Sequence, residues 1–209
     1  MLSPIFQRWR SALQVKSFRN KIIISGVLIG GCAFIAPILF QFIQQREGHT
    51  LNDYILSWLP AYDLSIWVFS LLYILILLGI LSLIQNPQLF LRTLQAYIIL
   101  TMLRFITLLL VPLNPPINII ELSDPVVQQF FYQQSITKDL FFSGHTSILI
   151  LLALAVSNNR LKFVLFSGAC VVAVMLLVQH AHYTVDIVLA PFFSWLAFTL
   201  AERIPQKPA

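Results

Sequence analysis

Two short polar motifs interrupt an otherwise apolar sequence, and each contains a histidine. In the second motif, His182 precedes Asp186 by four residues, so on a helix the two side chains share one face. A carboxylate that holds one ring nitrogen fixes the tautomer of the imidazole and leaves the other nitrogen free to attack or to accept a proton. In the first motif, His145 follows Ser143 and Gly144 at a predicted helix start, where backbone N–H groups favour an anion such as phosphate.

Each motif alone also has a structural interpretation. A His-x-x-x-Asp pair is more often a structural hydrogen bond than a catalytic dyad, and a Ser-Gly-His run is less informative still. His180 and His182 would supply half of a metal site, but the sequence offers no obvious further soft ligand. We therefore predict no metal and no organic cofactor. The combination of both motifs, in order at the starts of two apolar segments, favours chemistry.

The composition shows what must position these motifs. Apolar residues make up 58% of the 209 positions and charged residues 10%, and the mean hydropathy is +0.84. Soluble proteins carry about 25% charged residues, so we predict an integral, multi-pass membrane protein. A bilayer-spanning helix needs about 20 mainly apolar residues. We expect an all-α fold with six transmembrane helices, at residues 22–43, 64–84, 93–112, 141–157, 161–178 and 185–201.

The predicted domain plan has three parts. Residues 1–21 form a basic cytoplasmic tail, residues 22–204 form the membrane domain, and residues 205–209 form a short C-terminal tail. The first apolar run is longer than the apolar region of a secretory signal and has no convincing cleavage site, so we expect it to remain as a span. The net charge of +5 does not indicate nucleic-acid binding, because basic residues crowd the first 21 positions.

The distribution of basic residues predicts the orientation. Of the 13 Lys and Arg residues, ten fall on the side of the N-terminus, Arg46 and Lys138 fall on the other side, and Arg104 lies within a span. Cytoplasmic segments carry the excess of Lys and Arg, so we expect both termini in the cytoplasm. Both histidine motifs then lie on the extracytoplasmic face, which in a bacterium is the outer face of the plasma (inner) membrane.

The two motifs and their surroundings resemble a known family. The runs Lys-Asp-Leu-Phe-Phe-Ser-Gly-His-Thr (138–146) and His-Ala-His-Tyr-Thr-Val-Asp-Ile-Val-Leu-Ala (180–190) resemble the two C-terminal signatures of the sphingomyelin synthases, a branch of the type 2 phosphatidic acid phosphatase superfamily. Residues 104–107 and 111–116 look like the middle signature of this branch, and residues 59–63 are a poorer copy of its first one.

This resemblance implies a lipid phosphotransferase that moves a phosphorylated headgroup from a phospholipid to a lipid alcohol such as ceramide. It implies that His182 is the nucleophile that forms a phosphohistidine intermediate, that Asp186 orients its ring, and that His145 is the general acid and then the base. The expected partners are phospholipid and lipid-alcohol substrates and the surrounding membrane lipids. The residues that we expect to bind substrate are Asp139, Ser143, Gly144, Arg104 and Tyr183.

The sequence departs from the broader superfamily at positions that bind phosphate. Phe142 stands where the superfamily has Pro, and Met175 and Leu176 stand where it has a Ser-Arg pair. The Lys-x6-Arg-Pro motif is missing as well, so the cations that clamp a phosphate monoester are lost. This favours a diester substrate. The alternatives are a lipid phosphate phosphatase, in which Arg104 and Arg92 partly replace the missing cations, and a non-enzymatic transporter, for which the sequence shows no inverted repeat.

Overall fold

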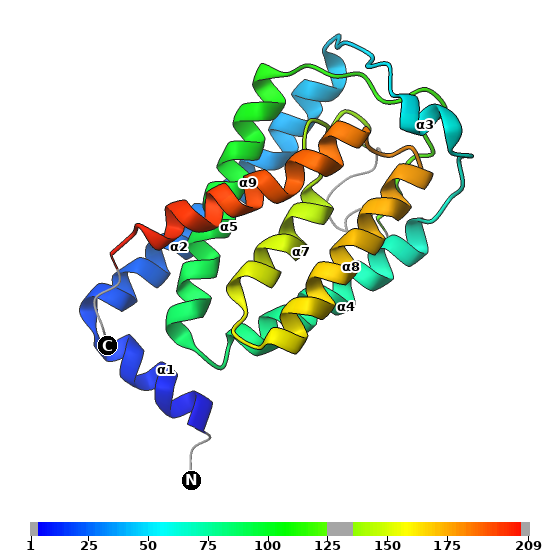
Figure 1. The fold of residues 1–209 in the computed structure, drawn as a ribbon. Coiled ribbons are helices and arrows are strands. Elements are labelled where there is room, and N and C mark those ends of the chain that lie inside the picture. The colour runs from blue at the N-terminus through cyan, green and yellow to red at the C-terminus, as the bar shows by residue number, and fades with distance from the viewer. Residues whose placement is uncertain (1–3, 125–135, 206–209) are drawn as a thin grey trace.

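The computed structural model describes residues 4–124 and 136–205, and every regular element within them is a helix. The predicted all-α class is therefore confirmed for the described part of the chain (Figure 1). The helices are α1 (Pro4–Gln14), α2 (Lys16–Gln45), α3 (Tyr54–Trp58), α4 (Ser65–Leu83), α5 (Pro87–Leu110), α7 (Gly144–Ala155), α8 (Asn159–Val178) and α9 (Thr184–Glu202).

Five of these helices, α2, α4, α5, α8 and α9, are long and apolar enough to cross a membrane, which supports a polytopic membrane protein. The fourth predicted span differs, because α7 has only 12 residues. At 1.5 Å per residue it is about 18 Å long, whereas the hydrocarbon core of a bilayer is about 30 Å thick. Length and composition thus support five of the six expected spans, and the orientation of the termini stays a prediction.

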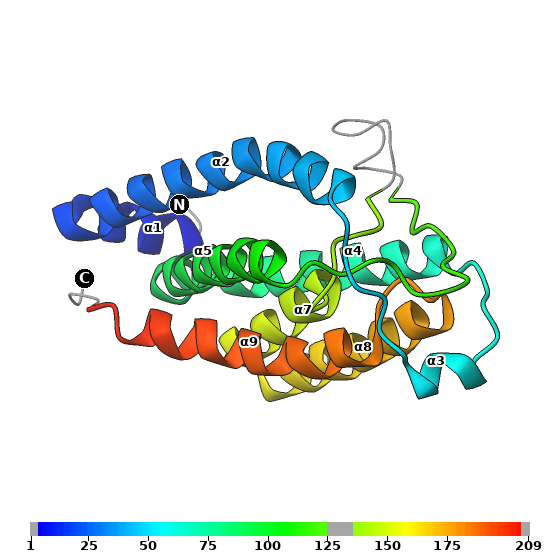
Figure 2. The ribbon, with the colours of Figure 1, turned by 90° about the horizontal axis from the view of Figure 1, so that it is seen from above.

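The short helix α7 lies in the centre of the bundle, where it packs against α4, α5, α8 and α9 (Figures 1 and 2). Eight of its 12 residues are buried, including Leu149 and Leu151, which have no exposed surface. A helix enclosed by other helices does not have to match the thickness of the bilayer by itself. The apolar character of the predicted span at residues 141–157 therefore reflects burial in protein.

Two turns capped by Asn86 and Asn158 fix which helix ends meet. The Asn86 side chain accepts hydrogen bonds from the N–H groups of Gln88 and Leu89, at 3.1 and 3.3 Å, and thereby begins α5. The Asn158 side chain accepts from Arg160 at 2.9 Å and begins α8. Both turns lie at one end of the bundle, so the starts of α7 and α9 lie together at the other end.

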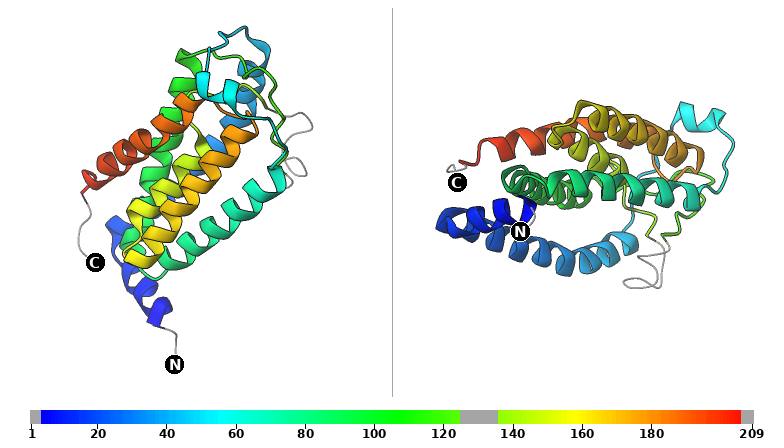
Figure 3. Two further views of the ribbon diagram at one scale, coloured as in Figure 1. Left: turned by 45° about the vertical axis from the view of Figure 1, so that its right-hand side comes forward. Right: turned by 90° about the horizontal axis from the view of Figure 1, so that it is seen from below.

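The N-terminal segment, predicted as a tail to residue 21, contains helix α1 and the first residues of α2. The two helices are separated by Val15, whose φ of −75° and ψ of 110° are extended rather than helical. The chain changes direction there, and α1 runs across the end of the bundle instead of along it (Figures 1 and 3). Helix α2 lies on the outside of the bundle and packs on α1 and α5.

Candidate active site

Asp186 is the centre of a buried hydrogen-bond network at the start of α9. Its side chain has no exposed surface, and one carboxylate oxygen lies 3.1 Å from Nδ1 of His182 and accepts from the backbone N–H of Tyr183 at 3.0 Å. The other oxygen accepts from the N–H of Phe141 at 3.0 Å. An ionised carboxylate only accepts hydrogen bonds, so in the neutral imidazole this contact places the proton of His182 on Nδ1 and leaves the lone pair on Nε2.

The same aspartate joins the two sequence motifs. The backbone N–H of Ser143 donates to the backbone oxygen of Asp186 at 3.0 Å. Phe141, whose N–H reaches the Asp186 carboxylate, has a φ of 92°, a conformation that L-residues other than glycine rarely adopt. The hydrogen bond to the buried carboxylate holds this turn and thereby sets where α7 begins. The prediction that both motifs share one end of the bundle is confirmed by these contacts.

His145 lies on the first turn of α7 and faces His182. The two ring centroids are 6.2 Å apart and the ring planes meet at 63°. On its other side, the His145 ring contacts the edge of Phe69 at a centroid distance of 5.6 Å. Nδ1 of His145 is buried and has no hydrogen-bond partner among the described residues. Reacting atoms approach to about 3–3.5 Å before a reaction, and the separation of the two rings is close to twice that distance.

Arg104, near the end of α5, connects this site to the loop that precedes α7. It forms an ion pair with Asp139 and donates a hydrogen bond to the backbone oxygen of Phe142 at 2.8 Å. Its guanidinium also lies 5.6 Å from the centre of the Phe142 ring, a cation–π geometry. Gly144 makes this approach possible, because a Cβ atom at that position would lie 2.5 Å from Nη1 of Arg104.

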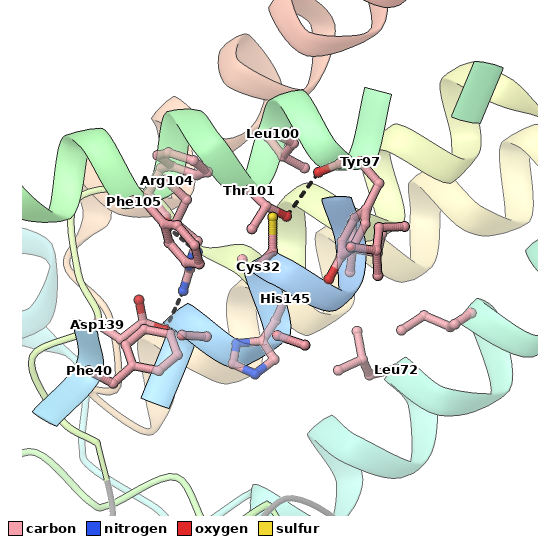
Figure 4. Close-up of a pocket in the computed structure, with 17 residues that line it drawn as sticks. Cys32, Phe40, Leu72, Tyr97, Leu100, Thr101, Arg104, Phe105, Asp139 and His145 are labelled. Atoms are coloured by element: carbon pink, nitrogen blue, oxygen red, sulfur yellow. Dashed lines mark hydrogen bonds and ion pairs between the residues drawn. The ribbon is translucent and has the colours of Figure 1, made fainter. Parts of the chain in front are cut away.

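A cavity of about 440 Å³ opens beside these groups, between α2, α4, α5 and α7 (Figure 4). Its polar end is formed by Arg104, Asp139, Gly144 and His145, and the rest of its lining is mainly apolar. One carboxylate oxygen of Asp139 is buried and has no hydrogen-bond partner among the described residues. Buried polar atoms are nearly always paired, so the unpaired atoms of Asp139 and His145 mark where a polar ligand group fits.

Helix α2 contributes mostly small and apolar side chains to the cavity, namely Ile29, Cys32, Ala33, Ala36 and Phe40. Their spacing of three or four residues places them on one face of α2. Figure 4 shows Cys32 and Phe40 of this helix among the side chains that line the cavity, together with His145 and Leu72. The cavity thus has a polar end and an apolar body, which suits a lipid with its phosphate at one end.

Most of the predicted site residues come together, but only Arg104, Asp139, Gly144 and His145 line the cavity. His182, which faces His145, and its partner Asp186 do not line it, and neither do Ser143 and Tyr183. Ser143 has no exposed surface, and its side-chain oxygen caps α7 by accepting from the N–H of Thr146 at 3.4 Å. Tyr183 is 1% exposed, and its hydroxyl donates to the backbone oxygen of Asn114 at 3.0 Å. Both side chains are buried and form hydrogen bonds within the protein. Their predicted contact with substrate remains a prediction.

Two of the predicted contributors lie elsewhere in the structure. Arg92, considered as a replacement for the missing phosphate-binding cations, lies at the opposite end of α5, 3.8 Å from Glu202. Both ring nitrogens of His180 face backbone oxygens, of Ile117 at 3.2 Å and of Leu59 at 3.1 Å. His180 therefore fastens two loops to the end of α8. Within the described residues, no group of three or more His, Cys, Asp or Glu residues is arranged to hold a metal ion.

Two further residues, which no motif singles out, hold the site in place. Asp53 accepts from the N–H of Thr184 at 2.6 Å and from its hydroxyl at 2.9 Å, so it anchors the start of α9. Gln179, which has no exposed surface, accepts from the N–H of Leu64 at 3.1 Å and donates to the hydroxyl of Ser65 at 2.7 Å. The position of Gln179 beside the second motif is a weak signal of this role, and no pattern in the sequence points to Asp53.

Comparison with known families agrees with this geometry. Residues 138–203 match the model described as PAP2 superfamily C-terminal, and the matched segment contains His145, His182 and Asp186. No curated protein matches the chain. The match supports membership of the type 2 phosphatidic acid phosphatase superfamily, whose members are generally phosphatases or phosphotransferases. It thereby supports an enzyme with a lipid phosphatase or phosphotransferase type of function.

Proposed function

We propose that the protein is a membrane lipid phosphotransferase that moves a phosphorylated headgroup from a phospholipid to a lipid alcohol such as a ceramide. The observation that carries this proposal is the buried pair of His182 and Asp186, which faces His145 beside a cavity with an apolar body. A nucleophile held by a carboxylate, a second histidine about one phosphoryl group away and space for acyl chains are the parts that such a transfer needs.

The reaction proceeds in two displacements. Nε2 of His182 attacks phosphorus, a nitrogen–phosphorus bond forms, and the bond from phosphorus to the diacylglycerol oxygen breaks. His145 gives its proton to that oxygen, and diacylglycerol leaves. His145 then accepts the proton of the acceptor hydroxyl as its oxygen attacks phosphorus and releases His182. Asp186 stabilises the charge on the His182 ring during both steps.

The charges around the cavity favour a diester as the donor. Among the described residues, Arg104 is the one Lys or Arg that lines the cavity, and it forms an ion pair with Asp139. The two basic residues of the neighbouring loops point elsewhere, because Arg46 donates to the backbone oxygens of Leu108 and Leu109, and Lys138 donates to that of Arg46. A phosphodiester carries one negative charge fewer than a fully ionised monoester, so it requires less compensation.

A lipid phosphate phosphatase is the second candidate. Arg104 supports it, because this cation lines the cavity together with His145 and would bind the oxygens of a monoester if Asp139 released it. In that enzyme, water takes the place of the lipid alcohol in the second displacement. The two candidates share His145, His182 and Asp186 and differ in the substrate that they prefer.

A panel of donor lipids separates the two candidates. The purified full-length protein is incubated with phosphatidylcholine, phosphatidylethanolamine or phosphatidic acid, each with and without ceramide, and the diacylglycerol and the headgroup product are measured. We expect the diesters to be cleaved faster, and the headgroup to appear on ceramide. Faster turnover of phosphatidic acid, unaffected by ceramide, would reject the transferase and establish the phosphatase.

A histidine substitution tests whether the site itself is correct. His182→Ala should remove activity on every donor while the protein remains folded. His49→Ala is the matched control, because His49 is exposed and lies at the same end of the molecule. Activity that survives in the His182 variant would exclude the phosphohistidine mechanism for both candidates.

A further inference from the structure

Helix α1 presents an apolar stripe that the rest of the protein covers only in part. Trp9 packs edge-on against Phe18 and Phe90, and its indole N–H donates to the backbone oxygen of Ile84 at 2.8 Å. On the same side of the helix, Ile5 and Leu13 remain exposed. The stripe is therefore wider than its protein contact, and part of it needs another apolar surface.

The end of the bundle that carries α1 is strongly basic. Among the described residues, this end holds Arg8, Arg10, Lys16, Arg19, Lys21, Arg92, Arg160, Lys162 and Arg203, at the starts of α2, α5 and α8 and the end of α9. Of the eight Asp and Glu residues in the chain, only Glu202 lies at this end. The excess of positive charge has no acidic protein surface to balance it there.

A cavity beside α1 contains unpaired polar atoms. It measures about 430 Å³ and lies between α1 and the start of α5, lined by Gln7, Arg8, Ser11, Pro87 and Gln88 among others. Both polar atoms of the Gln88 side chain are buried and have no hydrogen-bond partner among the described residues. Arg8 lines the same cavity, and one N–H group of its guanidinium donates to the backbone oxygen of Gln85 at 3.0 Å. An amide donor and a guanidinium that line one cavity are a combination suited to a phosphate oxygen.

We propose that α1 is an interfacial helix that binds anionic phospholipid headgroups of the membrane, at the end of the protein opposite the candidate active site. Ile5, Phe6 and Leu13 enter the boundary between headgroups and acyl chains, and Arg8, Arg10 and Gln88 face the phosphates. A helix that runs across the end of a membrane bundle, with one apolar face flanked by arginines, has the features of helices that lie in this interface. This proposal does not depend on the reaction that the site performs.

Hydrogen exchange of the full chain in lipid nanodiscs tests the proposal. The amides of residues 4–14 are followed in discs of phosphatidylcholine alone and in discs in which phosphatidylglycerol replaces part of it. We expect exchange in α1 to slow by about fivefold for each arginine that engages the anionic surface, and the difference should vanish at high salt. Exchange that is the same in both kinds of disc and at both salt concentrations would overturn the proposal.

Single substitutions show which contacts are responsible. Arg10→Gln should reduce the difference between the two kinds of disc, whereas Lys162→Gln removes the same charge at the same end but outside α1 and should leave it unchanged. Leu13→Gln should speed exchange of α1 in both kinds of disc. If Arg10→Gln and Lys162→Gln reduce the difference equally, general electrostatic attraction of this end to the membrane explains it, and the proposal of a binding role for α1 is overturned. Polyglutamate added to the neutral discs tests for an acidic protein partner. If exchange of α1 slows with polyglutamate but not with phosphatidylglycerol, the partner is an acidic protein segment and the proposal is overturned.

Discussion

The junction of α7 and α9 and the α2 side of the cavity are built in opposite ways. At the junction, Ser143 and Asp186 have no exposed surface and the backbone of one motif is hydrogen-bonded to the other. In the most apolar stretch of α2, only 11% of the residues are buried, compared with 39% in α5. The groups that we propose to react with phosphorus are thus held by several hydrogen bonds, while α2 is mostly exposed.

We infer that the junction of α7 and α9 sets the geometry of the reaction, and that the α2 side of the cavity accommodates the acyl chains of the lipid. A change at the junction alters the geometry of His145 and His182, so it should affect every substrate alike. A change on the cavity face of α2 alters the space for acyl chains, so its effect should depend on the chain length of the lipid. The predictions below test this division, beginning with the largest expected effect.

Asp186→Asn should reduce the turnover number by about 10⁴-fold on every lipid, as the loss of an orienting carboxylate does in other histidine sites. Asp186 accepts from three donors, and an amide offers a single acceptor oxygen and brings an N–H group toward donors. The measurement is diacylglycerol release by the purified variant. Glu47→Gln is the control, because Glu47 is an exposed carboxylate at the same end of the molecule. Nearly full activity in the Asp186 variant would make the network purely structural.

Gly144→Ala should reduce the turnover number by about 10²-fold, the size of effect that a displacement of about 1 Å can cause. The added methyl group would lie 2.5 Å from Nη1 of Arg104 and would push the guanidinium away from Asp139 and the site. Turnover is compared with that of Gly26→Ala, a substitution on α2 where no atom lies within 4 Å of the added group. Equal turnover in the two variants would show that the position of Arg104 is unimportant.

The local part of the site was predictable only in part. The contact of His182 with Asp186 was expected from one helix face, but α9 begins at Thr184, so His182 lies before the helix and Asp186 reaches back to it from the first turn. The meeting of the two motifs was predictable from the order and direction of the apolar segments. The turns at Asn86 and Asn158 were predictable from residue preference at helix starts.

Features that arise from packing between distant segments were not predictable in the same way. The length of α7 depends on the turn at Phe141, which is held by a carboxylate 45 positions along the chain. Apolar composition does not distinguish a helix that faces lipid from one that is enclosed by protein, so α7 was expected to span the membrane. The inward positions of Ser143 and Tyr183 likewise depend on their hydrogen-bond partners, which periodicity does not reveal.

Ala36→Phe should reduce kcat/KM by about tenfold for long-chain lipids, a typical cost when a pocket loses apolar contact with its substrate. Ala36 lines the cavity on α2, so a ring at this position fills part of the space for an acyl chain. Short-chain donors should be affected much less, and the turnover number should change little. Ile35→Phe is the matched control, since Ile35 is the preceding residue of α2 and is exposed. The same loss for short and long chains would mean that α2 helps to position the reacting groups.

Asp53→Ala should have the smallest effect, a loss of about 1 kcal/mol in the free energy of unfolding, typical for a removed helix cap. Asp53 caps α3 by accepting from the N–H groups of Ile55 and Leu56, at 3.0 and 3.2 Å, and it also anchors Thr184. Thermal unfolding of the purified protein measures the loss, with Glu47→Ala as a control at an exposed carboxylate of the same end. If the rate of the chemical step in this variant is normal, Asp53 holds the junction together and takes no part in the reaction.

The effect of Asp53 should also depend on pH. Partial burial raises the pKa of its carboxyl, but the hydrogen bonds from Thr184, Leu56 and Ile55 outweigh burial and hold the pKa below its ordinary value of 3.8. The folded state therefore favours the ionised form. Its stabilising contribution is complete above the ordinary pKa and is lost as the pH falls through the lowered one. The difference in unfolding temperature between the wild type and Asp53→Ala should shrink on acidification, and a difference that grows there would contradict the assigned hydrogen bonds.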